Sequence, residues 1–108
     1  GGAGNDFGAD PEQLLAAAMA SCHMQTFLAL AAKKRLQVKS YRDTASAEIA
    51  QREDGKFWVS VIRLTPKAVF TGEKIPDEAA IKAMHEKAHD HCFIANSTSS
   101  EVIVEPQF

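Results

Sequence analysis

The sequence lacks an excess of positive charge. Its 108 residues include 12 Lys and Arg against 14 Asp and Glu, which gives a formal net charge of −2 and a pI near 6.1. No cluster of Lys or Arg offsets this balance. Because a nucleic-acid-binding surface needs concentrated positive charge to neutralise phosphates, we do not expect a nucleic-acid partner.

Cysteine is also scarce. Cys22 and Cys92 are the only two, which is too few for the disulfide framework of a small secreted domain and suits a reducing compartment. The first residues, GGAGNDFGAD, lack the basic start and apolar core of a signal peptide. We therefore expect a cytoplasmic protein in which the two thiols are either catalytic or incidental.

Several motifs of common enzyme classes are missing. No glycine-rich phosphate loop follows a strand, and the serines near 97–100 show no nucleophile-elbow pattern. There is no internal repeat and no low-complexity segment. The length fits one domain over residues 1–108, in which Gly1–Ala9 forms a flexible, glycine-rich lead-in.

The most informative stretch that is present runs from Asp10 to Lys34. Asp10 is suited to cap a helix, Pro11 suits its first position, and the basic residues that begin at Lys33 favour its C-terminal end. The residues between are apolar around nearly the whole circumference, so this helix must be buried on almost every side. The polar residues Ser21, His23 and Gln25 interrupt the apolar stretch. This favours a buried core helix over a membrane span, and we expect no membrane partner.

The rest of the chain predicts an α+β fold with an antiparallel sheet. The expected elements are a strand over 37–50, a turn at 53–56, a returning strand over 57–70, a helix over 76–91 and a strand over 101–105. Pro66 cannot donate to a strand ladder, so the returning strand is at a sheet edge there, is bulged, or is broken. This is too little sheet to cover the first helix. A partner subunit, a further N-terminal segment, or both must cover the remainder.

Cys22 and Cys92 are the candidates for chemistry. Cys22 lies in mid-helix, where the helix dipole does not lower a thiol pKa, so a low pKa would need a cationic neighbour. Cys92 follows the His-rich sequence AHDH and precedes a polar stretch. The two could meet across the fold as a reversible disulfide, or their presence could be coincidental.

A metal site is a weaker alternative. His85, His89 and Cys92 have i, i+4, i+7 spacing, which would place them on one face if the second helix continued through Cys92, and this ligand set suits zinc. No clear fourth ligand is present, so a solvated polar face is favoured and no metal is expected. His23 projects to a different side of its helix from Cys22 and is interpreted as a core histidine.

Two segments resemble the motifs of a known family. PEQLLAAAMASC (Pro11–Cys22) resembles the first cysteine motif of the OsmC/Ohr family of thiol-dependent peroxidases, and AHDHCFIANST (Ala88–Thr98) resembles the second. The resemblance extends from Pro11 to about Glu105. It implies that Cys22 is the peroxidatic cysteine, that Cys92 resolves its sulfenic acid as a disulfide, and that Glu12 is the active-site glutamate.

The resemblance also implies an assembly and partners. The family fold is an intertwined homodimer with long central helices between sheets; the family's N-terminal strands are expected to be absent from this chain. The substrate would be an organic hydroperoxide and the reductant a dithiol, possibly on a lipoylated protein, with no cofactor. An alternative on the same fold is a non-catalytic dimer that binds a small apolar ligand or senses oxidants.

Two features bear on the implied site. The family's catalytic arginine precedes the first motif, and no arginine precedes Glu12 here, so none is assigned. Glu12 and Cys22 are ten residues apart, about 15 Å along a continuous helix. They therefore cannot touch within one straight helix, unless the helix starts later or an intermediary or a second subunit bridges them.

Overall fold

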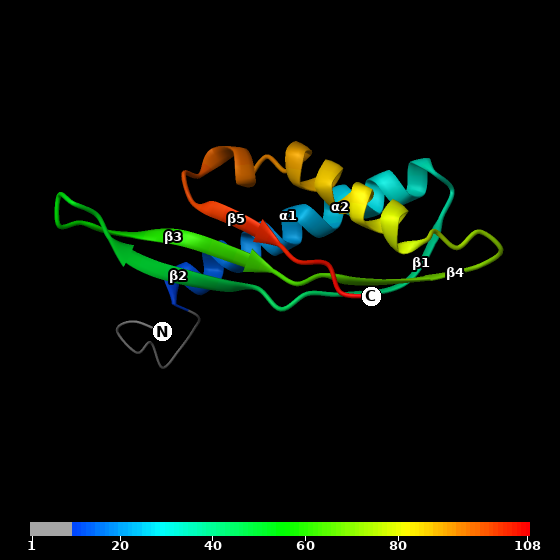
Figure 1. Cartoon of the computed structure of the whole chain (residues 1–108), viewed down its shortest axis with the longest axis horizontal. Helices are drawn as coiled ribbons and strands as arrows, with labels where there is room; N and C mark the ends of the chain where they lie inside the picture. Colours follow the sequence, from blue (N-terminus) through cyan, green and yellow to red (C-terminus); the bar gives the residue numbers. More distant parts are fainter. Residues whose placement is uncertain (1–9) are drawn as a thin grey trace.

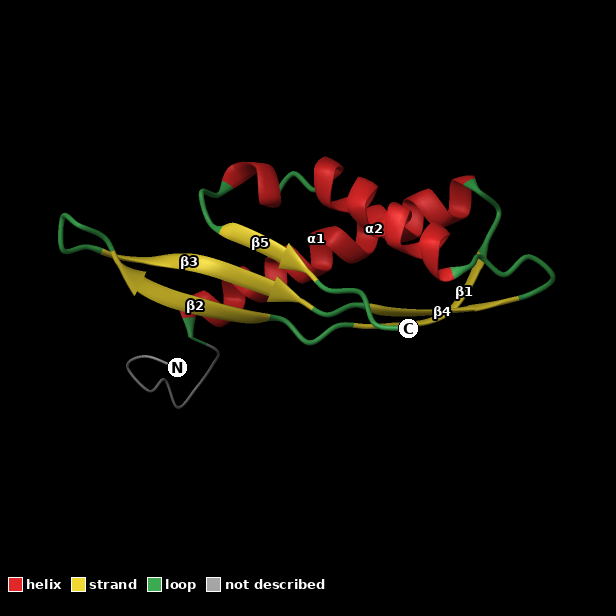
Figure 2. Ribbon diagram, viewed as in Figure 1, coloured by secondary structure: helices red, strands yellow, loops and turns green. Residues whose placement is uncertain are grey.

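The computed structural model describes residues 10–108 as two helices packed on one side of long, twisted strands (Figure 1). The predicted lead-in, Gly1–Ala9, lies outside the described residues. Figure 2 shows both helices on the same face of the strand layer. In chain order the elements are α1 (Pro11–Lys33), β1 (Gln37–Arg42), β2 (Ser46–Gln51), β3 (Phe57–Leu64), β4 (Lys67–Thr71), α2 (Glu78–His91), the short 3₁₀ helix η1 (Ala95–Ser97) and β5 (Glu101–Val104).

Helix α1 begins and ends through local signals. The Gln13 side chain accepts a hydrogen bond from the Asp10 backbone N–H at 3.3 Å, and Pro11 occupies the first helical position, as the sequence predicts. At the other end, Arg35 N–H bonds to Ala32 O and Leu36 N–H to Ala31 O, both at 3.0 Å. This is a Schellman motif, and it places Arg35 at φ 59°, a conformation that usually requires glycine.

The apolar circumference of α1 is only partly covered within one chain. The buried residues form one face: Ala16, Met19, Cys22, His23, Phe27 and Ala31. On the opposite face Leu14 is 59% exposed, so the predicted burial on almost every side is not achieved by this chain alone. By length and composition α1 could also cross a membrane. Its buried face packs on α2 and the strands.

The two long strands predicted from the sequence are each divided. A break was one of three alternatives expected at Pro66 in the second strand, and none was expected in the first. β1 pairs antiparallel with β4, while β2 pairs antiparallel with β3 in a separate sheet. The two sheets are interrupted at the same place along the strands. Pro66 has no N–H to donate to a neighbouring strand, and the Thr65 N–H donates to the Asp43 carboxylate at 2.8 Å. The turn at 53–56 is confirmed, with Gly55 at φ 85°.

The last strand does not extend the antiparallel pattern. β5 lies parallel to β3, with Ile62 opposite Val102 and Leu64 opposite Val104. A parallel neighbour needs a crossover connection, which here contains α2. The predicted α+β class with an antiparallel hairpin is therefore confirmed, and β5 is a parallel addition to it.

The core has two halves that share α1. The N-terminal half of the helix packs in a cluster that contains Ala16, Met19, Cys22, Ile62, Leu64 and Cys92. The C-terminal half packs in a second cluster, which contains Phe27, Ala31, Ala68, Ile81, Met84 and Ala88. Both cysteines therefore belong to the same cluster, although they come from different elements.

Candidate active site: a pair of buried thiols

Cys92 meets Cys22 because α2 stops one residue before it. The backbone of Cys92 is extended (φ −73°, ψ 109°), and its N–H bonds to His89 O at 3.2 Å. The chain turns away from the helix axis at this point and enters η1. The Cys92 side chain thereby packs against α1, where Cys22 lies in mid-helix; the two are 1% and 7% exposed.

Hydrogen bonds determine the ionisation of Cys22. Burial raises the pKa of this thiol, but the Cys92 thiol and the backbone N–H groups of Ile94 and Phe93 lower the pKa below its ordinary value. The Thr26 hydroxyl donates to the Cys22 carbonyl oxygen at 2.8 Å. A low pKa at this mid-helix position was expected to need a cationic neighbour. That expectation is wrong, because the turn after Cys92 supplies backbone donors instead.

Cys92 has the opposite tendency. Burial raises the pKa of its thiol, and the hydrogen bond to Cys22 and the proximity of the Cys22 charge raise the pKa further. The Ala95 N–H donates weakly to Cys92 Sγ at 3.5 Å. Of the two thiols, Cys22 is thus the more easily ionised. Both are free thiols in this structure.

The arrangement that the less favoured zinc alternative requires does not form. Because α2 ends at His91, the single face through His85, His89 and Cys92 does not form. Cys92 packs beside Cys22, whereas the His85 ring contacts His23 and Phe27. Within residues 10–108 the structure contains no group of three or more His, Cys, Asp or Glu side chains arranged to hold a metal ion.

His23 and His85 form a pair that the sequence did not reveal. Both rings are 1% exposed, which confirms His23 as a core histidine, and His23 Nε2 lies 2.9 Å from His85 Nδ1. Burial lowers the pKa of each imidazole to about 4, assisted for His23 by the charges of His85 and His89. The pair is therefore neutral at physiological pH. Sequence spacing gives no signal for a contact between residues 62 positions apart.

The other candidate residues lie away from the thiols. α1 is continuous from Pro11 to Lys33, so Glu12 stays about 15 Å along the axis from Cys22. Arg63 alternates with inward-facing neighbours on β3 and pairs with Glu48 and Glu105, each at 3.3 Å. Among the described residues, the hydrogen-bonding groups that shift the Cys22 pKa include no cation.

Comparison with known proteins gives a consistent result. A model of the OsmC-like protein family matches residues 2–107. The organic hydroperoxide resistance protein of Xanthomonas axonopodis pv. citri is 30% identical over 105 residues, which are 96% of this chain and 68% of that protein.

Solved structures share the fold. An OsmC-like protein of unknown function from Vibrio cholerae superimposes with a TM-score of 0.91 at 41% identity, over 95% of this chain and 67% of that one. The organic hydroperoxide resistance protein OhrB of Bacillus subtilis gives a TM-score of 0.79 at 22% identity, over 94% and 73% of the two chains. The second likeness concerns the fold alone.

Proposed function

Because this chain belongs to the OsmC-like protein family, we propose that it is a thiol-dependent peroxidase that reduces organic hydroperoxides. The observation that carries the proposal is the packing of Cys92 and Cys22 in one buried cluster, with the pKa of one thiol raised and that of the other lowered. A nucleophilic thiolate beside a protonated thiol is the arrangement that two-cysteine peroxide reduction needs. The relative named for organic hydroperoxide resistance supports the substrate class.

The proposed reaction has three balanced steps. The Cys22 thiolate attacks the terminal peroxide oxygen; the O–O bond breaks, Cys22 becomes a sulfenic acid, and the alkoxide takes a proton to leave as an alcohol. The Cys92 sulfur then attacks the Cys22 sulfur and expels water, which leaves a disulfide. A dithiol reductant reopens that disulfide by two thiol exchanges and is itself oxidised to a disulfide.

The turn after Cys92 has a further role in this proposal. The backbone N–H groups of Phe93 and Ile94 that lower the Cys22 pKa are fixed dipoles that stabilise the thiolate without a charged side chain. They belong to the same segment as the resolving cysteine. If this segment moves when Cys92 forms the disulfide, the Phe93 and Ile94 N–H groups leave Cys22 at that stage. By then the Cys22 thiolate has already reacted with the peroxide.

A second copy of this chain is the proposed cover for the open face of α1. The exposed positions of that face are small, apolar or uncharged: Leu14, Ala17, Ala18, Ser21 and Gln25. Small residues allow two helices to approach closely, and burying this face would complete the core. Glu12 lies at the start of the same helix, so we propose that its carboxylate acts in the site of the dimer, either across the interface or through an intermediary.

We also propose a reductant and a compartment. A dithiol reopens a disulfide by two successive exchanges within one partner, and a lipoylated protein would supply such a group. A reducing cytoplasm would keep both thiols in the free form that the reaction needs.

Turnover assays test the proposal. Reduced protein should consume cumene hydroperoxide in the presence of dihydrolipoamide, and Cys22→Ser should abolish consumption. If wild-type protein with two intact thiols consumed no peroxide, the peroxidase proposal would fail. Formation of one disulfide per chain without turnover would instead favour the alternative of an oxidant sensor.

A further inference from the structure

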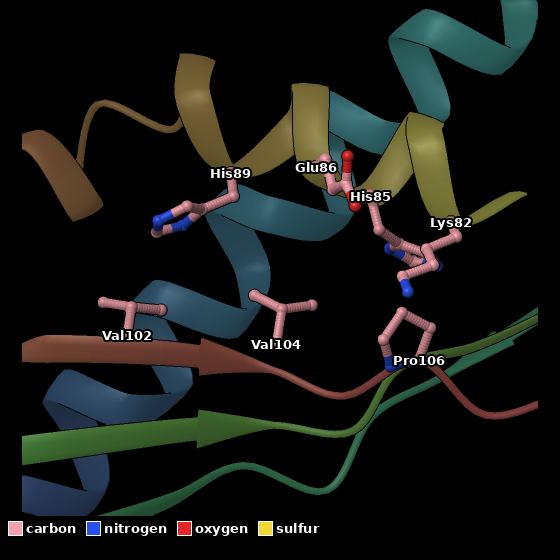
Figure 3. A pocket seen from close by; sticks show the side chains of 7 residues that line it. All are labelled: Lys82, His85, Glu86, His89, Val102, Val104 and Pro106. Atoms are coloured by element: carbon pink, nitrogen blue, oxygen red, sulfur yellow. The ribbon is translucent and has the colours of Figure 1, made fainter.

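A cavity lies between α2 and the C-terminal segment, apart from the thiols. It has a volume of about 200 Å³, and neither cysteine is among its lining residues. One wall is apolar and consists of Val102, Val104 and Pro106. The other wall is a polar stripe of α2 that consists of Lys82, His85, Glu86 and His89. Figure 3 shows the two walls facing each other.

The histidine pair behind this cavity has an unmet hydrogen-bonding requirement. His85 Nδ1 is bonded to His23 Nε2, and the two remaining ring nitrogens, His85 Nε2 and His23 Nδ1, are buried without a partner. A neutral imidazole carries one proton, so a pair joined by one hydrogen bond must present a free donor at one end and a free acceptor at the other. Leaving such buried groups unpaired is destabilising.

His85 is the member of the pair that lines the cavity. It is 1% exposed, and Nε2 is its one ring nitrogen that is not bonded to His23. In Figure 3, Lys82 and His85 project from α2 toward Pro106, whereas the Glu86 carboxylate remains beside the helix. Within the described residues no ion pair engages the Lys82 ammonium. In Figure 3, the Lys82 side chain and the His85 ring thus lie at the same end of the apolar wall.

We propose that this cavity binds a small monocarboxylate with an apolar chain. The carboxylate accepts hydrogen bonds from Lys82 Nζ and from His85 Nε2–H, and the hydrocarbon chain lies against Val102, Val104 and Pro106. This arrangement selects one tautomer of the pair. His85 carries its proton on Nε2, His23 carries its proton on Nε2 and donates it to His85 Nδ1, and His23 Nδ1 is the free acceptor.

The size of the cavity limits the ligand. Sites for drug-sized molecules occupy about 300–1,000 Å³, so a cavity of about 200 Å³ suits a short chain such as hexanoate. The proposal does not depend on peroxidase activity, because the thiols take no part in binding. Failure of either proposal leaves the other intact.

The test uses reduced wild-type protein, ¹⁵N-labelled on histidine, with sodium hexanoate as the probe. Saturable shifts of the His85 ring nitrogens, with those of exposed His91 unchanged, are expected. Lys82→Met keeps the apolar stem and should weaken hexanoate binding about tenfold, the loss of one charge-assisted contact. The matched control, Lys87→Met, changes an exposed lysine of α2 outside the cavity and should leave the affinity unchanged.

A neutral probe separates carboxylate recognition from general apolar binding. 1-Hexanol has the same chain without the charge, so it should bind more weakly than hexanoate and be insensitive to Lys82→Met. Absence of a saturable His85 shift would overturn the proposed site. Equal binding of hexanol and hexanoate, with no effect of Lys82→Met, would overturn the assignment to carboxylates.

Discussion

Cys92 packs against Cys22 where the end of α2 meets the middle of α1. This proximity lowers the pKa of the proposed nucleophile and places the proposed resolving thiol beside it. Both effects depend on α2 ending at His91, because one more helical residue would redirect the Cys92 side chain.

Replacement of Cys92 should separate the two halves of the proposed reaction. In Cys92→Ala, the first attack on hydroperoxide should persist in a single turnover, but the Cys22 sulfenic acid should accumulate because no thiol condenses with it. Dithiol-dependent turnover should fall at least tenfold. Trapping with dimedone and mass spectrometry would detect the intermediate. Cys22→Ser is the control and should show no adduct; a wild-type turnover rate in Cys92→Ala would contradict the resolving role.

Phe93 tests the backbone donors. Phe93→Pro removes the N–H that hydrogen-bonds Cys22, whereas Phe93→Ala keeps it and trims a side chain that is 71% exposed. Since a hydrogen bond to a charged group contributes about 1.5 kcal/mol, the Cys22 pKa should rise by about one pH unit in the proline variant only. The pH profile of iodoacetamide alkylation in a Cys92→Ala background measures this. Equal shifts of the Cys22 pKa in both variants would refute the contribution of the Phe93 backbone N–H.

The histidine pair should make the fold sensitive to mild acid. Burial lowers the pKa of His23 and His85 to about 4, from an ordinary 6.5. Between these values the unfolded chain binds protons that the folded chain does not. The free energy of unfolding is therefore highest above pH 6.5 and should fall by several kcal/mol toward pH 4.

Urea unfolding at pH 7.5, 6.0 and 4.5 measures this loss. The exposed His91 provides the control, because His91→Gln should leave the pH dependence of the free energy of unfolding unchanged. His23→Leu combined with His85→Met should remove most of this pH dependence. A stability that does not change with pH over this range would show that the pair is not held neutral.

Arg35 limits the stability of the end of α1. Its φ of 59° is unfavourable for a residue with a side chain, and glycine adopts it without this cost. Arg35→Gly should raise the free energy of unfolding by about 1 kcal/mol. Lys34→Gly is the matched control: Lys34 has φ −84°, so glycine there should stabilise nothing and should cost about 0.5–1 kcal/mol. Thermal or urea unfolding of both variants decides between them.

The open face of α1 predicts the oligomeric state. Ala18→Arg places a long cation in the proposed helix contact and should shift the protein from dimer to monomer in light scattering. Ala83→Arg makes the same change at an exposed position of α2 and should leave the dimer intact. A wild-type chain that is monomeric at high micromolar concentration would contradict the proposed assembly.

Local signals in the sequence were sufficient for the main elements. Asp10 and Pro11 marked the start of α1, and Asp54-Gly55 marked the hairpin, because caps and turns depend on a few neighbouring residues. The division of the strands was less visible. The alternating pattern continues across Asp43, and the bond from Thr65 N–H that helps to end both strands comes from 22 positions away.

The sequence by itself determined which residues could do chemistry: two cysteine motifs, in order, on a helix and after a helix. Only the tertiary structure decided how they would act. It brought the thiols together, supplied backbone N–H donors in place of a cation, separated Cys92 from His85, and joined His85 to His23. The physical reason is that ionisation and hydrogen bonding depend on the atoms within a few ångströms, which the chain assembles from distant segments.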